Sequence, residues 1–262
     1  MLFGLCTSLS AVQSLPAGVF NFVEENVQSF LVPEKSEAEF QANLDLAKSG
    51  PFPVRAANCF LPAGLKCTGP RVDEARLANY AAVAFVRAEK AGIHTIVFGS
   101  GGARQLQDGF PKEHAIEQLI AFGKVLAPLA QRHGVTVVIE PLNSGECNFI
   151  NTLAEGAEIV RRVDHSNVRL LADIFHMLHE GEGPGEIIKF GELLHHVHVA
   201  ERAERTPPGT AGDDFSDFFR ALRDVGYSGP ISIEAGGWKE MAAEVGNSFS
   251  VLRKQAASAG LM

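Results

Sequence analysis

The sequence lacks the features that mark membrane-spanning and nucleic-acid-binding proteins. None of its apolar stretches approaches the roughly 20 residues that a membrane-spanning helix needs. Lysines and arginines form no run, and 23 basic against 31 acidic residues give a formal net charge of −8. Such an acidic surface repels phosphate backbones and anionic lipid. We therefore expect neither nucleic acid nor a membrane among its partners.

We expect neither paired cysteines nor a secretory leader. The 4 cysteines are scattered without metal-binding or disulfide spacing, so we expect reduced thiols. The apolar segment 1–17 contains no lysine or arginine, whereas a secretory signal begins with positive charge. We expect this segment to form a first strand and its loop, and the protein to be cytoplasmic.

Short apolar runs alternate with longer amphipathic segments along the chain. The expected strands are residues 2–6, 19–23, 53–57, 94–98, 135–140, 168–173, 195–199 and 231–234. The helical patterns 73–91 and 112–133 are each followed by a glycine, Gly92 and Gly134, which is typical of a helix end. The run 135–140 is almost continuously β-branched, as expected of a strand buried on both faces.

This alternation predicts the fold. Strictly alternating strand–helix units form a parallel sheet, and eight of them at this length indicate an α/β protein with a single (β/α)8 TIM-barrel domain over residues 1–262. An open doubly wound sheet is the alternative, and it requires a glycine-rich dinucleotide loop after the first strand. The first strand here runs into Thr7-Ser8-Leu9-Ser10, which lacks that loop.

Three acidic residues and a histidine stand at the ends of four consecutive expected strands. Glu140, Asp173 and Glu234 end the fifth, sixth and eighth strands, and His198 lies near the end of the seventh. The carboxyl ends of barrel strands meet at one mouth, so these side chains converge there. Taken singly, each is equally typical of a helix cap or a loop. Together they predict a site for one divalent metal ion (Mn²⁺, Mg²⁺, Co²⁺ or Zn²⁺), since three crowded carboxylates require a cation.

Other polar residues flank these four. Glu146 lies in the loop after the fifth strand, His176 follows Asp173 by three positions, and Arg205 lies in the loop after the seventh strand. A barrel mouth that holds a polyol needs such groups, so all three are candidate substrate contacts. His196 shares a strand face with His198, and it is equally consistent with a hydrogen-bonded histidine inside the barrel.

Several segments resemble the sugar isomerase/epimerase superfamily of xylose-isomerase-like TIM barrels, and in detail the ketose 3-epimerases. They lie between about residues 90 and 235 and are Ile139-Glu140-Pro141-Leu142-Asn143, Asn148-Phe149-Ile150-Asn151-Thr152, Asp173-Ile174-Phe175-His176-Met177, His196-Val197-His198-Val199-Ala200-Glu201 and Ser232-Ile233-Glu234. The resemblance implies the same four metal ligands as above, and substrate binding by Glu146, His176 and Arg205. Arg202 is a rival to Arg205 in the same loop. Ser144 stands where many relatives carry arginine, which implies a different substrate profile.

The resemblance also implies an activity, namely a metal-dependent isomerase or epimerase of a small keto-sugar or sugar phosphate. A Lewis-acidic metal stabilises the enediolate that forms when the hydrogen next to the carbonyl is removed. We expect Glu140 and Glu234 to be the catalytic acid/base groups as well as metal ligands. Two bases on opposite faces of the sugar give epimerisation, and one base that serves two neighbouring carbons gives isomerisation. We expect a homodimer or homotetramer.

Four other functions remain as alternatives. The main one is a metal-dependent dehydratase or lyase of a keto-inositol or related keto-polyol, which begins with the same proton abstraction. An apurinic endonuclease of this superfamily needs histidines at the third and fourth strand ends, where Asn58-Cys59 and Gly99-Ser100-Gly101 stand. The others are a non-catalytic sugar-binding barrel and a hydroxypyruvate isomerase, and His198 disfavours the latter. A substrate phosphate would find backbone amides and an arginine in the segment 99–104.

Overall fold

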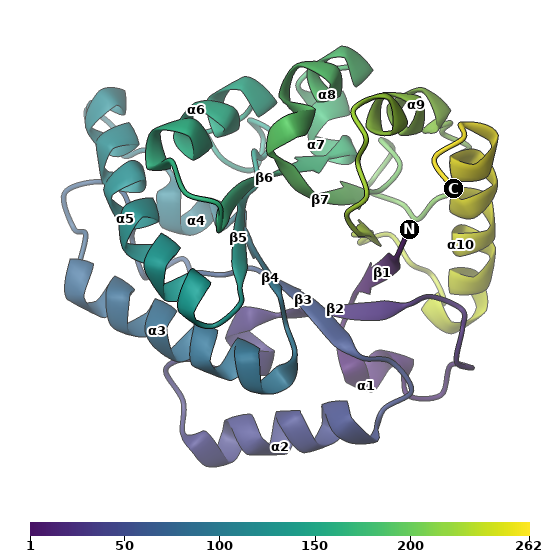
Figure 1. Cartoon of the computed structure of the whole chain (residues 1–262), viewed down its shortest axis with the longest axis horizontal. Helices are drawn as coiled ribbons and strands as arrows, with labels where there is room; N and C mark the ends of the chain where they lie inside the picture. The colour runs from purple at the N-terminus through teal and green to yellow at the C-terminus, as the bar shows by residue number, and fades with distance from the viewer.

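In the computed structural model, which describes all residues 1–262, eight parallel strands close into a barrel (Figure 1). The strands are β1 (Phe3–Cys6), β2 (Phe22–Asn26), β3 (Val54–Asn58), β4 (Thr95–Phe98), β5 (Thr136–Ile139), β6 (Val168–Asp173), β7 (Leu194–Val199) and β8 (Ile231–Ile233). Each strand pairs with its neighbours in sequence, and β1 pairs with β8 to close the ring. The predicted TIM barrel is confirmed, and the open doubly wound sheet is wrong.

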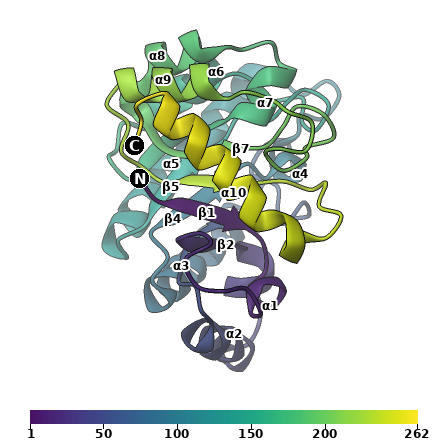
Figure 2. The same cartoon turned by 90° about the vertical axis from the view of Figure 1, so that its right-hand side faces the viewer.

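The helices lie around the outside of the barrel, and the two chain ends lie close together in both views (Figures 1 and 2). The helices are α1 (Leu9–Val12), α2 (Glu37–Ser49), α3 (Glu74–Ala91), α4 (Gly101–Arg104), α5 (Lys112–Arg132), α6 (Leu153–Val163), α7 (Ile174–His179), α8 (Pro184–Phe190), α9 (Ser216–Asp224) and α10 (Met241–Ser258), with a π-helical turn η1 (Val27–Leu31) and a 3-10 turn η2 (Gly191–Leu193). None combines the length and the hydropathy of a membrane-spanning segment.

The long helices begin and end where the sequence predicts. In α3, the side chain of Asp73 accepts a hydrogen bond from the backbone N–H of Arg76, and Gly92 ends the helix at a φ of +75°, the left-handed region that favours glycine. The short helices α1, α4 and α7 were not predicted. Each spans only 4 to 6 residues, too few for an amphipathic period to show in the sequence.

The second strand lies three residues later than predicted. It begins at Phe22 rather than at Val19, because its register with β1 pairs Phe22 with Gly4. Two glutamates, Glu24 and Glu25, therefore belong to the strand and are buried. The apolar run ends before these acids, so hydrophobicity alone placed the strand too early.

The inner face of the barrel carries its polar groups toward the mouth. Val97, Val138 and Leu171 on β4, β5 and β6 form a small buried cluster, separate from the main core of 72 buried residues. Side chains two positions apart on a strand face the same side. Two residues further along the chain from Val97, Val138 and Leu171 stand Gly99, Glu140 and Asp173, respectively. At β5 and β6 a carboxylate therefore lies next to an apolar residue toward the mouth, while Gly99 at β4 adds no side chain.

Candidate metal and substrate site

The structure brings the predicted metal ligands Glu140, Asp173, His198 and Glu234 into one group. One potential ligand atom from each lies within 4.8 Å of the others. His198 Nδ1 is 3.2 Å from Glu140 Oε1 and 2.9 Å from Glu234 Oε2. Three of the four are buried, and Glu234 is partly exposed. The group therefore offers one nitrogen and three carboxylates to a single ion.

The charges of this group call for a cation. The positive charges beside the three carboxylates are Arg205 and a protonated His198, and His198 also faces a fourth carboxylate, Glu24. Arg205 Nη2 is 2.8 Å from Asp173 Oδ2 and also contacts Glu234 Oε2. Burial raises the pKa of Glu140, and the charge of Glu234 adds to this against the opposing hydrogen bond from His198. Burial would also raise the pKa of Glu234, but the charges of His198 and Arg205 hold it at about 2. Hard oxygen donors with one imidazole and too little positive charge fit a divalent metal ion.

Asp173 caps a helix and also faces the other candidate ligands. Its Oδ1 accepts hydrogen bonds from the backbone N–H groups of Phe175 at 2.8 Å and His176 at 3.4 Å, and so caps α7. Its Oδ2 faces Arg205 and lies 3.5 Å from His176 Nε2. Helix capping therefore orients this carboxylate toward the group.

Two residues from the first half of the barrel shape the carboxylates. Gly99, just after β4, leaves room for Glu140, because a Cβ at this position would lie 2.1 Å from Glu140 Oε2. At the end of β3, Asn58 Nδ2 donates a hydrogen bond of 2.8 Å to Glu234 Oε1. In the sequence both positions mark strand ends without a histidine, and Gly99 also begins the candidate phosphate segment 99–104. Their signal was their location at strand ends.

The candidate substrate residues Glu146, His176 and Arg205 lie beside the four candidate metal ligands. His176 Nδ1 is 2.8 Å from Asn143 Nδ2, which in turn is 3.0 Å from Glu146 Oε1. Arg205 Nη1 is 3.5 Å from the same glutamate oxygen. All three line a cavity of about 430 Å³ together with Glu140 and Glu234. Its size is within the range of small-molecule sites.

A buried carboxylate holds the loop that carries Arg205. Glu201 accepts hydrogen bonds from the hydroxyl of Thr206 and from backbone N–H groups of Gly209, Ala211, Gly212 and Asp213. Burial would raise the pKa of Glu201, but these amide donors hold it below its usual value.

The two arginines of this loop differ in position. Arg205 stacks on the Phe175 ring at 4.7 Å and reaches the acidic group. Arg202 is exposed and does not line the cavity. Arg205, and not Arg202, therefore lines the cavity.

The segment 99–104 does not offer a cation to a substrate phosphate. Arg104 is buried, and its guanidinium donates to the backbone carbonyls of Phe98 at 3.0 Å and Glu140 at 2.7 Å. Its role is to tie the ends of β4 and β5 together. Arg205 is then the only lysine or arginine that lines the cavity.

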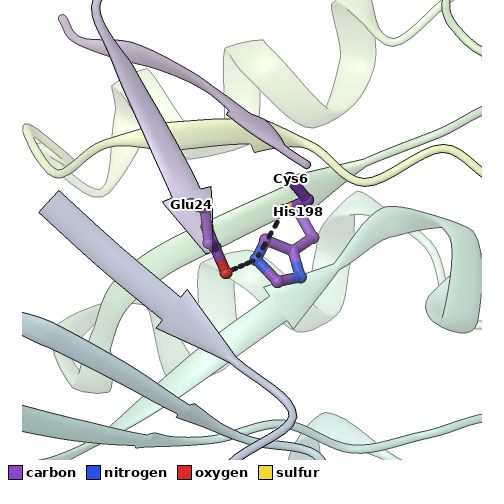
Figure 3. A group of neighbouring side chains, drawn as sticks. All are labelled: Cys6, Glu24 and His198. Carbon is purple, nitrogen blue, oxygen red and sulfur yellow. Dashed lines mark hydrogen bonds and ion pairs between the residues drawn. The ribbon is translucent and has the colours of Figure 1, made fainter. Parts of the chain in front are cut away.

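Sequence analysis did not assign Glu24 to the site. This carboxylate points from β2 toward His198 of β7, and Cys6 at the end of β1 lies beside them (Figure 3). Burial would raise the pKa of Glu24, but His198 and His196 hold it well below its usual value. His196 is thus a hydrogen-bonded histidine inside the barrel, 2.8 Å from Glu24 Oε2. The only signal in the sequence was an acid directly after an apolar run.

The chain is similar to several known proteins. A family model described as xylose isomerase-like TIM barrel matches residues 11–255. A D-psicose 3-epimerase from Ruminiclostridium cellulolyticum is 34% identical over 138 residues, or 52% of this chain and 46% of the relative. A 3-dehydro-D-guloside 4-epimerase from Escherichia coli is 34% identical over 112 residues, or 42% of each chain. The aligned part spans slightly less than half the length of these curated relatives.

The likeness of the whole fold extends further than the sequence identity. The crystal structure of a D-allulose 3-epimerase from Methylomonas sp. covers 97% of this chain and 98% of its own, with a TM-score of 0.81 at 21% identity. At this sequence identity the superposition shows similarity of the fold alone. It includes the first half of the barrel, where the sequence resemblance is weakest.

Proposed function

The chain belongs to the xylose isomerase-like TIM-barrel family, and on this premise we propose that it is a metal-dependent epimerase or isomerase of a small ketose. The observation that supports this most directly is the group of four ligand atoms within 4.8 Å of one another. Similarity to a D-psicose 3-epimerase and a 3-dehydro-D-guloside 4-epimerase supports a sugar substrate. Epimerisation is the outcome that these relatives favour.

Glu140, Asp173, His198 and Glu234 would hold the metal ion. A divalent ion there supplies Lewis acidity, which makes the hydrogen next to a ketone carbonyl easier to remove. Glu140 and Glu234 both approach His198 Nδ1, at 3.2 and 2.9 Å, and both line the cavity. We assign to them the removal and the return of that proton.

The remaining polar residues bind and orient the sugar. Glu146 accepts hydrogen bonds from sugar hydroxyls, while Arg205 donates them and His176 does either. Arg205 is the only lysine or arginine in the cavity, and it already contacts Asp173 and Glu234. An uncharged ketose therefore suits this cavity better than a sugar phosphate, which would bring about two further negative charges.

A deuterium-exchange screen tests the proposed function. The protein is stripped with a chelator, reloaded separately with Mn²⁺, Mg²⁺, Co²⁺ or Zn²⁺, and incubated in D₂O with ketoses and ketose phosphates. We expect metal-dependent deuterium incorporation at the carbon next to the carbonyl, together with an epimer or an aldose. Loss of water during turnover would instead identify the dehydratase or lyase. Ketose binding without any exchange would identify a sugar-binding barrel.

The single domain, the homodimer or homotetramer, the cytoplasmic location and the identity of the metal stay predictions. Light scattering on the purified protein would test the assembly. Metal analysis of protein purified without added ions would test the choice among the four metals.

A further inference from the structure

We propose that Glu24 is a positioning residue for the metal, which it serves by orienting His198. In this arrangement Nδ1 of His198 faces the ion, and its Nε2–H donates to the Glu24 carboxylate. The inference rests on the metal site of the proposed function and adds to it a residue that touches neither the ion nor the sugar.

The two ring nitrogens of His198 face different groups. Nε2 is 2.9 Å from Glu24 Oε1, a normal hydrogen-bond distance. Nδ1, on the other side of the ring, lies close to Glu140 and Glu234. Figure 3 shows Glu24 and Cys6 meeting His198 at its Nε2 side. The His198 ring therefore connects the carboxylate of Glu24 in the barrel interior to the candidate metal ligands at the mouth.

Glu24 is held in place by a second histidine. Its Oε2 lies 2.8 Å from Nε2 of His196, whose ring is 4.9 Å from that of His198 between centroids. The Oγ of Ser232 lies 3.3 Å from the same His196 nitrogen. Glu24 is 1% exposed and both histidines are 0% exposed. Each oxygen of this carboxylate thus accepts from one imidazole, and no lysine or arginine forms an ion pair with it.

The hydrogen bond has a consequence for metal binding. A neutral imidazole carries one N–H, and a metal binds the nitrogen that lacks it. A carboxylate at Nε2 keeps the proton there, leaves the lone pair of Nδ1 free, and makes Nδ1 a stronger donor. Losing such a carboxylate partner typically weakens metal affinity by about 10–100-fold.

A second metal site that includes Cys6 is the one competing explanation for the contact between Glu24 and His198. Cys6, Glu24 and His198 could themselves hold an ion, since their ligand atoms lie within 4.8 Å of one another. However, Cys6 Sγ is 3.9 Å from His198 Nε2, whereas Glu24 is at hydrogen-bond distance from both histidines. These contacts satisfy both oxygens of Glu24 without an ion. We therefore infer a hydrogen bond and not a second metal site.

The test compares Glu24→Gln with Glu25→Gln. The first substitution keeps the shape of the side chain and one acceptor oxygen but removes the charge. Glu25 is the adjacent buried glutamate on β2, and its carboxylate accepts from the backbone N–H groups of Leu9 at 2.6 Å and Asn26 at 3.2 Å. Mn²⁺ is titrated into the chelator-stripped proteins with electron paramagnetic resonance of the free ion, and Tm is measured without metal. We expect Glu24→Gln to weaken Mn²⁺ binding about 10–100-fold, and Glu25→Gln to lower Tm at unchanged affinity.

Each other result has a definite meaning. Wild-type protein that binds no metal refutes the proposed function itself. Unchanged Mn²⁺ affinity in Glu24→Gln overturns the inference alone, and a lower Tm without an affinity change shows a merely structural role. Two ions per wild-type chain and one per variant chain would make Glu24 a ligand, which also overturns it.

A second measurement covers the case in which Glu24→Gln does not fold. Nitrogen-15 spectra of labelled histidines in the wild-type protein loaded with Zn²⁺ report which His198 nitrogen carries the proton. We expect a protonated Nε2 and a metal-bound Nδ1. The opposite pattern would overturn the inference.

Discussion

The two halves of the barrel contribute different things to the site. Strands β5 to β8 carry the four grouped side chains Glu140, Asp173, His198 and Glu234 at or next to their ends. Strands β1 to β4 carry none of these, and supply instead the partners that hold them, namely Glu24, Asn58 and the open space at Gly99. The second half offers donor atoms and the first half fixes their orientation. Changes in the second half should abolish activity, whereas changes in the first should weaken it.

The largest effect is expected from the acid/base carboxylates of the second half. We expect Glu140→Gln and Glu234→Gln each to lower the exchange of substrate hydrogen with solvent by roughly 10²–10⁴-fold, because each removes a group that moves the proton. Exchange is measured in D₂O with a ketose that turns over. Glu113→Gln, an exposed position in the first turn of α5, is the control. Wild-type exchange in both variants would refute the assignment.

Gly99→Ala tests the space that the first half provides. The added Cβ would lie 2.1 Å from Glu140 Oε2, the far end of a flexible side chain. We expect the carboxylate to move and metal affinity to fall about 10-fold, with little change in Tm. Gly64→Ala is the matched control, since a Cβ there meets nothing within 4 Å. Equal metal affinities in the two variants would show that the position of Glu140 is not set by this glycine.

Glu201→Gln tests how firmly the Arg205 loop is held. The amide leaves one acceptor oxygen for five donors, and a hydrogen bond to a charged group contributes about 1.5–3 kcal/mol. We expect KM for the ketose to rise about tenfold while kcat changes less, since Arg205 binds sugar and moves no proton. Steady-state kinetics separate the two constants. A fall in kcat alone would contradict this role.

Asn58→Ala tests the support that the first half gives to Glu234. A typical hydrogen bond contributes about 0.5–1.5 kcal/mol net, and Arg205 and His198 still contact Glu234. We therefore expect less than a tenfold loss in kcat/KM. A loss as large as that of Glu234→Gln would mean that Asn58 itself takes part in the reaction.

The smallest effect concerns protons that leave on metal binding. Burial opposes protonation of His198, but the charges of Glu24 and Glu234 raise its pKa well above the usual value, which favours the protonated ring in the metal-free protein. The ion must displace the Nδ1 proton, so we expect release of about one proton per ion and affinity that increases with pH. Calorimetry in buffers of different ionisation enthalpy measures this release. No release near neutral pH would contradict it.

The same contacts predict how the stability of the metal-free protein depends on pH. The raised pKa of His198 gives stability that is fully present below 6.5 and is lost as pH rises through the folded-state pKa. The lowered pKa of Glu24 gives stability that is present above 4.5 and is lost as pH falls through the folded-state pKa. Thermal unfolding of the chelator-stripped protein across pH would show both limbs. With metal bound, the loss of stability at high pH should be smaller.

The sequence predicted the fold and the grouped side chains because both depend on local patterns. Alternating strands and helices admit few topologies, and a closed parallel barrel brings every strand end to one mouth. Glu140, Asp173, His198 and Glu234 each end or nearly end a strand, so their convergence follows from their positions alone. The exact start of β2 did not follow, because its buried glutamates interrupt the hydrophobic run by which a strand is recognised.

The residues that hold those side chains in place become evident only when the barrel is closed. Glu24 and His198 are 174 positions apart, on β2 and β7, which β8 and β1 separate in the barrel. A glutamate is stable in that interior only because two imidazoles receive it, and nothing in the local sequence around either residue signals the other. Local sequence patterns therefore predict where the donor atoms gather. Closure of the barrel determined how they are oriented, since that depends on contacts across its interior.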